Sequence, residues 1–187
     1  KKYKNIDIVA CGSASFAGQI GKYYIERYAN IKTEVYYASE YRYQKNFFTK
    51  DTLVILISQS GETADTLAAL KLAKENGIDT LAIVNRRDSS IAREADSVIY
   101  TEAGIEVAVA TTKAYLAQVL ILLLLAFKDN NKDMDLVQKK IRNLISNLAT
   151  CGLIASQTSN EDLRMIIDNF LNGGIKYESG TVITSDN

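Results

Sequence analysis

The stretch LVILISQSGETADTL, residues 53–67, passes from an apolar run through a hydroxyl-rich turn into a helical pattern. The apolar run 53–57 has no alternation of polar residues, which is typical of a strand buried on both faces. The turn offers Ser58, Ser60 and Thr63 as hydroxyls and Gly61 as a site of close backbone approach. A buried strand, a turn and a helix in this order are the unit of a parallel α/β sheet.

The hexamer 58–63 has two interpretations. Serine, threonine and a first-turn acid are what an ordinary helix start prefers, and Glu62 would then cap the helix that follows. Hydroxyls, a glycine and the unpaired amides of a helix N-terminus also suit a phosphate group. The hexamer by itself leaves both interpretations open.

Four further segments read as strands and three as helices, together with one short helical turn. The strands are 7–10, 33–38, 80–84 and 97–101, the helices are 16–28, 64–76 and 90–95, and the turn is 39–40. Helices that alternate with apolar strands predict a doubly wound α/β fold with a five-stranded parallel sheet. The common flavodoxin-like strand order for such a sheet is 2-1-3-4-5.

Beyond residue 111 the pattern becomes helical, over 111–128, 134–148 and 160–171, with a possible strand at 181–184. We therefore expect one α/β domain over 1–130 and a helical extension over 131–187. The leucine-rich segment 116–127 is shorter than the ~20 residues of a membrane span. It predicts a homodimer interface or a helix buried inside the monomer.

The amino-acid composition excludes several classes of function. Lysine and arginine number 22 and so do aspartate and glutamate, so we expect no nucleic-acid partner and no membrane partner. Histidine is absent, which excludes serine–histidine hydrolysis and histidine-ligated metal sites within this chain. We expect no metal and no cofactor. Two distant cysteines and no signal-peptide pattern predict a cytoplasmic protein.

Parallel sheets bind ligands at the carboxyl ends of their strands, where the strand order reverses. That rule brings the turn 11–15, after the first strand, beside the turn 58–63. Neither turn has the lysine of a Walker A loop, and Gly12 with Gly18 makes no dinucleotide fingerprint. A small phosphorylated metabolite therefore fits better than a nucleotide. The loop 102–113 is a third candidate, either as a plain loop or as a segment that meets the ligand.

Four segments together resemble the first sugar isomerase (SIS) domain of the glutamine:fructose-6-phosphate aminotransferase (isomerizing) family, the glucosamine-6-phosphate synthases. They are SQSGETADTL at 58–67, ASEYRY at 38–43, SSIARE at 89–94 and AGIEVAVATTKA at 103–114. The resemblance covers about residues 5–128 and implies the α/β fold described above. It also implies a fructose 6-phosphate or glucosamine 6-phosphate ligand and a role in amino sugar biosynthesis.

The resemblance also implies which residues bind the substrate. The phosphate would be held by Ser58, Gln59, Ser60 and Thr63, and the sugar would be contacted by Val109 and Thr111. The family's glycine turn usually reads Cys-Gly-Thr-Ser, and its serine touches the ligand. Here alanine occupies that serine's place at position 14, which leaves Ser13 and Ser15 as the hydroxyls that could replace it.

No catalytic residue is assigned. In the family, the glutaminase cysteine, and the glutamate, lysine and histidine of the second SIS lobe and the C-terminal tail, lie outside the segment that this chain resembles. Proton transfer between sugar carbons needs a placed base, and Glu62 and Glu106 are acids in the candidate loops. We expect this chain to bind a sugar phosphate without turning it over unaided, with 131–187 leading toward an absent second lobe.

The sequence is also compatible with two other functions. A single SIS module could report the level of a sugar phosphate to a partner without catalysis. A relative of the fructosamine-6-phosphate deglycases is the other alternative, although the segment 106–113 favours the aminotransferase family.

Overall fold

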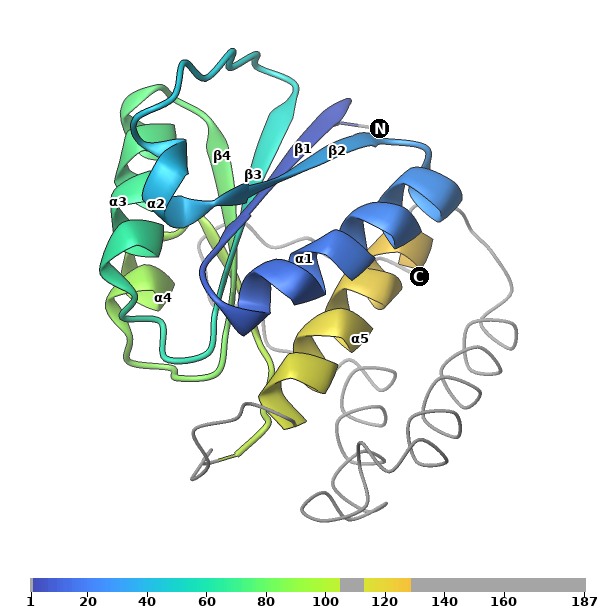
Figure 1. Cartoon of the computed structure of the whole chain (residues 1–187), viewed down its shortest axis with the longest axis vertical. Helices are drawn as coiled ribbons and strands as arrows, with labels where there is room; N and C mark the ends of the chain where they lie inside the picture. The colour runs from blue at the N-terminus through green and yellow to red at the C-terminus, as the bar shows by residue number, and fades with distance from the viewer. Residues whose placement is uncertain (1, 105–112, 129–187) are drawn as a thin grey trace, which may run out of the picture.

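The computed structural model describes residues 2–104 and 113–128 (Figure 1). The described elements are β1 Asn5–Ala10, α1 Ser13–Tyr24, the π-helical turn η1 Ile25–Ala29, β2 Lys32–Tyr37, α2 Ala38–Tyr41, β3 Thr52–Ser58, α3 Ala64–Glu75, β4 Asp79–Val84, α4 Ser90–Glu94, β5 Ser97–Tyr100 and α5 Lys113–Lys128. The helices and strand predicted over 134–148, 160–171 and 181–184 lie outside the described residues, as does the boundary proposed at residue 130.

The five strands form one parallel sheet in the order β2-β1-β3-β4-β5. This confirms the predicted fold class and strand order. β3, the middle strand of the sheet, has the longest continuous apolar run of the five strands, and it is buried at every position except Leu53. Strands of this kind need cover on both faces, and the helices supply it.

Helices cover the two faces in separate groups (Figure 1). α1 and α5 lie on one face, and α2, α3 and α4 lie on the other. Side chains along the strands alternate between the two cores, as the period of two requires. In β3, Ile55 and Ile57 enter the core under α1 and α5, whereas Val54 and Leu56 enter the core under α3.

The helix predicted over 16–28 is longer and less regular than the apolar spacing indicated. It begins at Ser13 and changes to a π-helical turn at Ile25, and Asn30 then ends it in the left-handed conformation with φ 51°. α1 lies close to its neighbours because small residues face them. A Cβ placed on Gly21 would come within 2.6 Å of Leu122 on α5.

α5 is covered on nearly all sides within this single chain. Between Ala114 and Phe127 only Tyr115 and Leu125 are more than marginally exposed. The apolar surface that suggested a homodimer is thus accounted for by packing in the monomer, the alternative that the sequence left open. Among the described residues, no helix combines the length and apolar character that a bilayer span needs.

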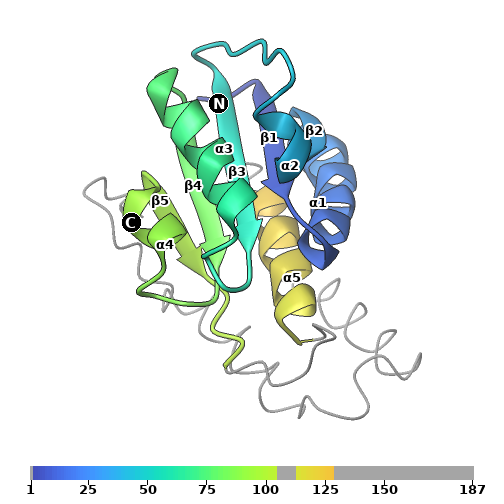
Figure 2. The same ribbon diagram turned by 60° about the vertical axis from the view of Figure 1, so that its left-hand side comes forward.

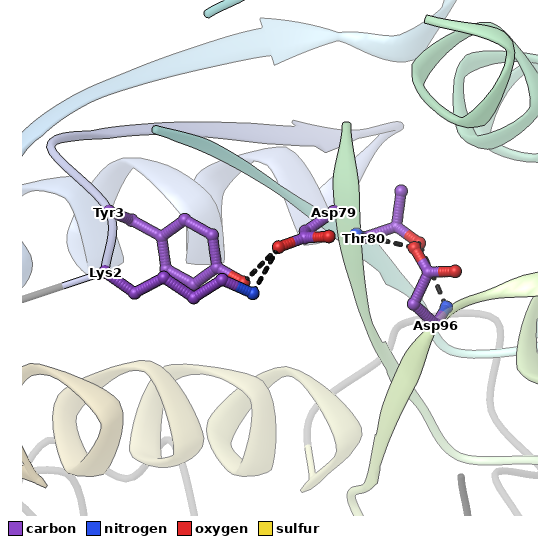
Figure 3. Close-up of polar contacts among 5 residues, drawn as sticks. All are labelled: Lys2, Tyr3, Asp79, Thr80 and Asp96. Carbon is purple, nitrogen blue, oxygen red and sulfur yellow. Dashed lines mark hydrogen bonds and ion pairs between the residues drawn. The ribbon is translucent and has the colours of Figure 1, made fainter. Parts of the chain in front are cut away.

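Polar contacts close the amino end of the sheet (Figure 3). Asp79, the first residue of β4, accepts hydrogen bonds of 2.6 Å from the Lys2 ammonium and the Tyr3 hydroxyl. The Thr80 hydroxyl donates to the Asp96 carboxylate at 2.7 Å and accepts from the Asp96 backbone N–H at 3.0 Å. These contacts tie the chain start and β5 to β4, at the end of the sheet opposite to the turns 11–15 and 58–63.

A partly buried carboxylate on β1 gives the stability a pH dependence. The Asp7 carboxylate accepts a 2.9 Å hydrogen bond from Tyr41, whose side chain is fully buried. Desolvation by burial raises the pKa of Asp7, and although the Tyr41 hydrogen bond opposes it, the net shift is upward. The folded state therefore favours protonated Asp7. The stability that this protonation contributes is lost as the pH rises from the unfolded-state pKa of about 3.9 through the higher pKa of the folded state.

We expect Asp7→Asn to be more stable than the wild type at pH 7, because the amide keeps an acceptor for Tyr41 and removes the poorly solvated charge. The gain should shrink as the pH is lowered toward 4, where the wild-type carboxylate becomes protonated. Urea unfolding of both proteins at pH 7 and pH 4.5 measures this difference. A gain that is the same at both pH values would contradict the explanation.

Candidate functional site

The turn after β3 is organised by its own hydroxyl groups. The buried Ser58 hydroxyl accepts a 3.0 Å hydrogen bond from the Gly61 backbone N–H and lies 2.9 Å from the Thr63 hydroxyl. The Ser60 hydroxyl accepts a 3.2 Å hydrogen bond from the Glu62 backbone N–H. Gly61 has φ +65°, a conformation that favours glycine. The turn is therefore a fixed loop with three hydroxyl groups spaced along it.

The hydroxyls of this turn do not cap α3. Thr63 occupies the N-cap position, but its side chain makes no hydrogen bond to the backbone N–H groups of the first turn. The interpretation of the hexamer as an ordinary helix cap therefore does not describe this helix. The Thr63 side chain therefore leaves the N-terminal amides of α3 unoccupied, and their partial positive charge favours an anion there.

The turn after β1 contributes a second group of polar atoms. Gly12 has φ +57°, and its carbonyl oxygen accepts hydrogen bonds from the Ser15 backbone N–H at 3.0 Å and from the Ser15 hydroxyl at 2.6 Å. Ser15 is only 3% exposed, whereas Ser13 is exposed. Of the two hydroxyls considered as replacements at this turn, Ser13 is the one open to a ligand.

The two turns adjoin, as the strand order predicts. β1 and β3 are neighbours in the sheet, with Ala10 beside Ile57 at their carboxyl ends. The Thr66 hydroxyl, in the first turn of α3, lies 3.9 Å from the Cys11 sulfur. Figure 2 shows both turns at the same end of the sheet, below β1 and β3. The hydroxyl groups of both turns thus lie at the point where the strand order reverses, the usual ligand site of this sheet type.

Glu62 does not cap its own helix, which corrects the sequence-based expectation. Its carboxylate accepts a 2.8 Å hydrogen bond from the backbone N–H of Ser90, the first residue of α4. This backbone hydrogen bond is the largest influence that lowers the pKa of Glu62. The carboxylate is therefore held by a different helix, and the partner residue lies 28 positions away in the sequence.

The loop after β5 is held by Asn85, which the sequence did not single out. The side-chain oxygen of Asn85 accepts hydrogen bonds from the Thr101 hydroxyl at 2.8 Å and from the Ala103 backbone N–H at 2.9 Å. Its side-chain nitrogen donates to the Gly104 backbone carbonyl at 2.7 Å. The only signal in the sequence was its place directly after β4. Val109 and Thr111, expected to contact the sugar, lie outside the described residues.

The groups that the described residues of the site present to an anion are mainly hydroxyls and backbone amides. Gln59 is partly exposed beside the hydroxyls, and its backbone carbonyl accepts a hydrogen bond from the Asn85 N–H at 3.2 Å. No group of three or more cysteine, aspartate or glutamate side chains comes together as a metal site in the part of the chain that the structure describes. The arrangement suits recognition of a phosphate by neutral donors.

Comparison with known proteins shows the family to which this chain belongs. The sequence matches the SIS domain family over residues 1–128. It is 56% identical over 126 residues to the glutamine–fructose-6-phosphate aminotransferase (isomerizing) of Clostridium tetani, an alignment that covers 67% of this chain and 21% of that protein. The enzyme of the same name from Legionella pneumophila is 45% identical over 173 residues, 90% of this chain and 28% of that protein.

Solved structures give the same relationship. The C-terminal domain of glucosamine-fructose-6-phosphate aminotransferase from Francisella tularensis is 39% identical, with a TM-score of 0.71 over 80% of this chain and 46% of that chain. Glucosamine-6-phosphate deaminase from Thermotoga maritima is 26% identical, with a TM-score of 0.68 over 73% of this chain and 43% of that chain.

This chain spans about a quarter of the length of the curated relatives that it matches. The match to the family nevertheless extends over more than half of the chain and includes both hydroxyl-bearing turns. The chain therefore belongs to the SIS domain family, and within it is homologous to the isomerase region of the glutamine–fructose-6-phosphate aminotransferases.

Proposed function

We propose that this chain is the sugar-phosphate-binding half of the isomerase region of a glucosamine-6-phosphate synthase, which makes glucosamine 6-phosphate from fructose 6-phosphate and glutamine. The observation that carries the proposal is the turn 58–63, which bears three hydroxyls directly before α3 and whose N-cap residue Thr63 makes no side-chain cap hydrogen bond. Its place beside the turn 11–15 supports the same ligand site. The identity of the sugar is proposed from the relatives, which are named as glutamine–fructose-6-phosphate aminotransferases.

The proposed roles divide by chemistry. Ser58, Gln59, Ser60 and Thr63 bind the phosphate, together with the amides at the start of α3. Ser13 supplies the hydroxyl at the neighbouring turn, since the Ser15 hydroxyl already donates to Gly12. Val109 and Thr111 contact the sugar, as the resemblance implies. The ligand is fructose 6-phosphate or glucosamine 6-phosphate.

This chain binds the substrate, and other parts of such an enzyme supply the chemistry. Isomerisation needs a base placed at the sugar carbons. In the turns 11–15 and 58–63 the acid is Glu62, whose carboxylate already accepts a hydrogen bond from Ser90. The setting proposed is cytoplasmic. A homodimer is also proposed, although the leucine-rich helix no longer argues for it, because that helix is buried within the monomer.

The proposal predicts that the purified chain binds fructose 6-phosphate and that the phosphate is required. Isothermal titration calorimetry with fructose 6-phosphate should show saturable binding, because the hydroxyls and amides of the turn recognise the phosphate oxygens. Fructose without the phosphate should give no heat at a tenfold higher concentration. Glucosamine 6-phosphate, titrated in parallel, shows which sugar is preferred. Equal binding of fructose and fructose 6-phosphate would remove the turn 58–63 from the proposal.

A further inference from the structure

The turn 58–63 is held from outside by the beginning of α4. The Glu62 carboxylate accepts the hydrogen bond from the Ser90 N–H, and the Gly61 carbonyl accepts a 3.0 Å hydrogen bond from the Ile91 N–H. Ser89 packs directly against Gly61, so closely that a Cβ there would lie 2.0 Å from its hydroxyl oxygen. Two successive residues of the turn thus bind two successive residues of α4.

Only one of these contacts is made by a side chain of the turn. The Gly61 carbonyl belongs to the backbone and survives any substitution, whereas the contact from Glu62 depends on its carboxylate. The Glu62 backbone N–H in turn donates to the Ser60 hydroxyl, one of the proposed phosphate ligands. Residue 62 therefore joins a ligand hydroxyl on one side to α4 on the other.

The charge of Glu62 would oppose a phosphate, so electrostatic attraction cannot explain a carboxylate at this position. Its charge is balanced from the α4 side. The Ser90 N–H is the main cause of its lowered pKa, and the positive charges of Arg93 and Arg86 act in the same direction. What remains for Glu62 to contribute to the anion site is geometry.

We propose that Glu62 is a positioning residue of the phosphate turn, and that the first turn of α4 is thereby part of the sugar-phosphate site. This inference rests on the proposed function of the turn 58–63. Glu62 fixes the turn in its binding conformation before the ligand arrives, which lowers the entropy cost of binding. Its own charge reduces the attraction for the anion, and the positional gain exceeds that loss.

The two effects are separated by comparing Glu62→Gln with Glu62→Ala. The glutamine keeps an oxygen that accepts from Ser90 and removes the charge, so its affinity for fructose 6-phosphate should equal or exceed that of the wild type. The alanine removes both, and its affinity should be about tenfold lower than that of the glutamine variant, because the side-chain hydrogen bond from the turn to α4 is lost. Glu75→Ala, at the exposed far end of α3, is the matched control and should bind like the wild type.

A ligand-free measurement tests the positioning by itself. Amide hydrogen exchange at Gly61, Glu62 and Ser90 should be about tenfold faster or more in Glu62→Ala than in Glu62→Gln, because local opening of the turn becomes easier. Equal exchange in the two variants, or equal affinity, would overturn the role of Glu62. A wild-type chain that binds no sugar phosphate would instead defeat the proposed function, and the exchange rates would still decide whether Glu62 holds the turn.

Discussion

Replacing Ser60 and Thr63 together by alanine is expected to weaken binding of fructose 6-phosphate by about 100-fold or more. Each hydroxyl removed costs a hydrogen bond to a charged group, worth about 1.5–3 kcal/mol, and two such losses correspond to factors of roughly 10²–10⁴. Removal of the Thr63 hydroxyl also frees Ser58, which lies 2.9 Å from it. Isothermal titration calorimetry of the purified double variant measures the loss directly.

The control for this experiment is a hydroxyl of the same chain that lies away from the turns. Ser97 begins β5 at the amino end of the sheet, and Ser97→Ala should bind fructose 6-phosphate like the wild type. Thermal unfolding of both variants shows whether the fold is retained. Unchanged affinity in a folded double variant would exclude the turn 58–63 as the phosphate site.

The strand order could be predicted from the sequence because the apolar runs of the strands are local signals. Residues 53–57 are apolar at every position, and a strand covered on both faces buries such a run. Sheets of this type have few common strand orders, and the order 2-1-3-4-5 puts the turns 11–15 and 58–63 side by side. The sequence alone therefore predicts that the two turns are neighbours.

The contacts of Glu62 and Asn85 could not be predicted in the same way. Glu62 binds an N–H at Ser90, and Asn85 binds atoms at Thr101, Ala103 and Gly104. These partners lie on different elements, and they meet only after β3, β4 and β5 are aligned at one edge of the sheet. A carboxylate before a helix looks locally like a cap of that helix, so the local rule gave the wrong partner.

The structure also shows why glycine occupies position 61. From the sequence, the reason could only be the conformational freedom of glycine. Gly61→Ala is expected to destabilise the protein by about 1–2 kcal/mol from the left-handed backbone alone. The added Cβ would further meet the Ser89 hydroxyl oxygen at 2.0 Å and the Ser89 Cβ at 2.4 Å. Ser89 is 2% exposed, so relief of this overlap in a packed environment costs a further ~1–3 kcal/mol.

Gly77→Ala separates the two costs, because Gly77 has φ +68° and, apart from its two chain neighbours, no residue has an atom within 4 Å of the position that a Cβ would take there. It should show the backbone cost without the overlap, so urea unfolding should find Gly61→Ala the less stable of the two. Equal losses of stability would mean that Ser89 yields without cost.

The same pair of variants connects stability to binding. Relief of the overlap at Gly61 moves the turn 58–63 away from α4, whereas Gly77 lies at the far end of α3 from that turn. Gly61→Ala should therefore also lose affinity for fructose 6-phosphate, and Gly77→Ala should keep it. The close approach of Gly61 to Ser89 and the hydrogen bond from Ser90 to Glu62 both join the turn 58–63 to the start of α4. A displaced turn is therefore expected to lose this hydrogen bond and, with it, affinity for the ligand.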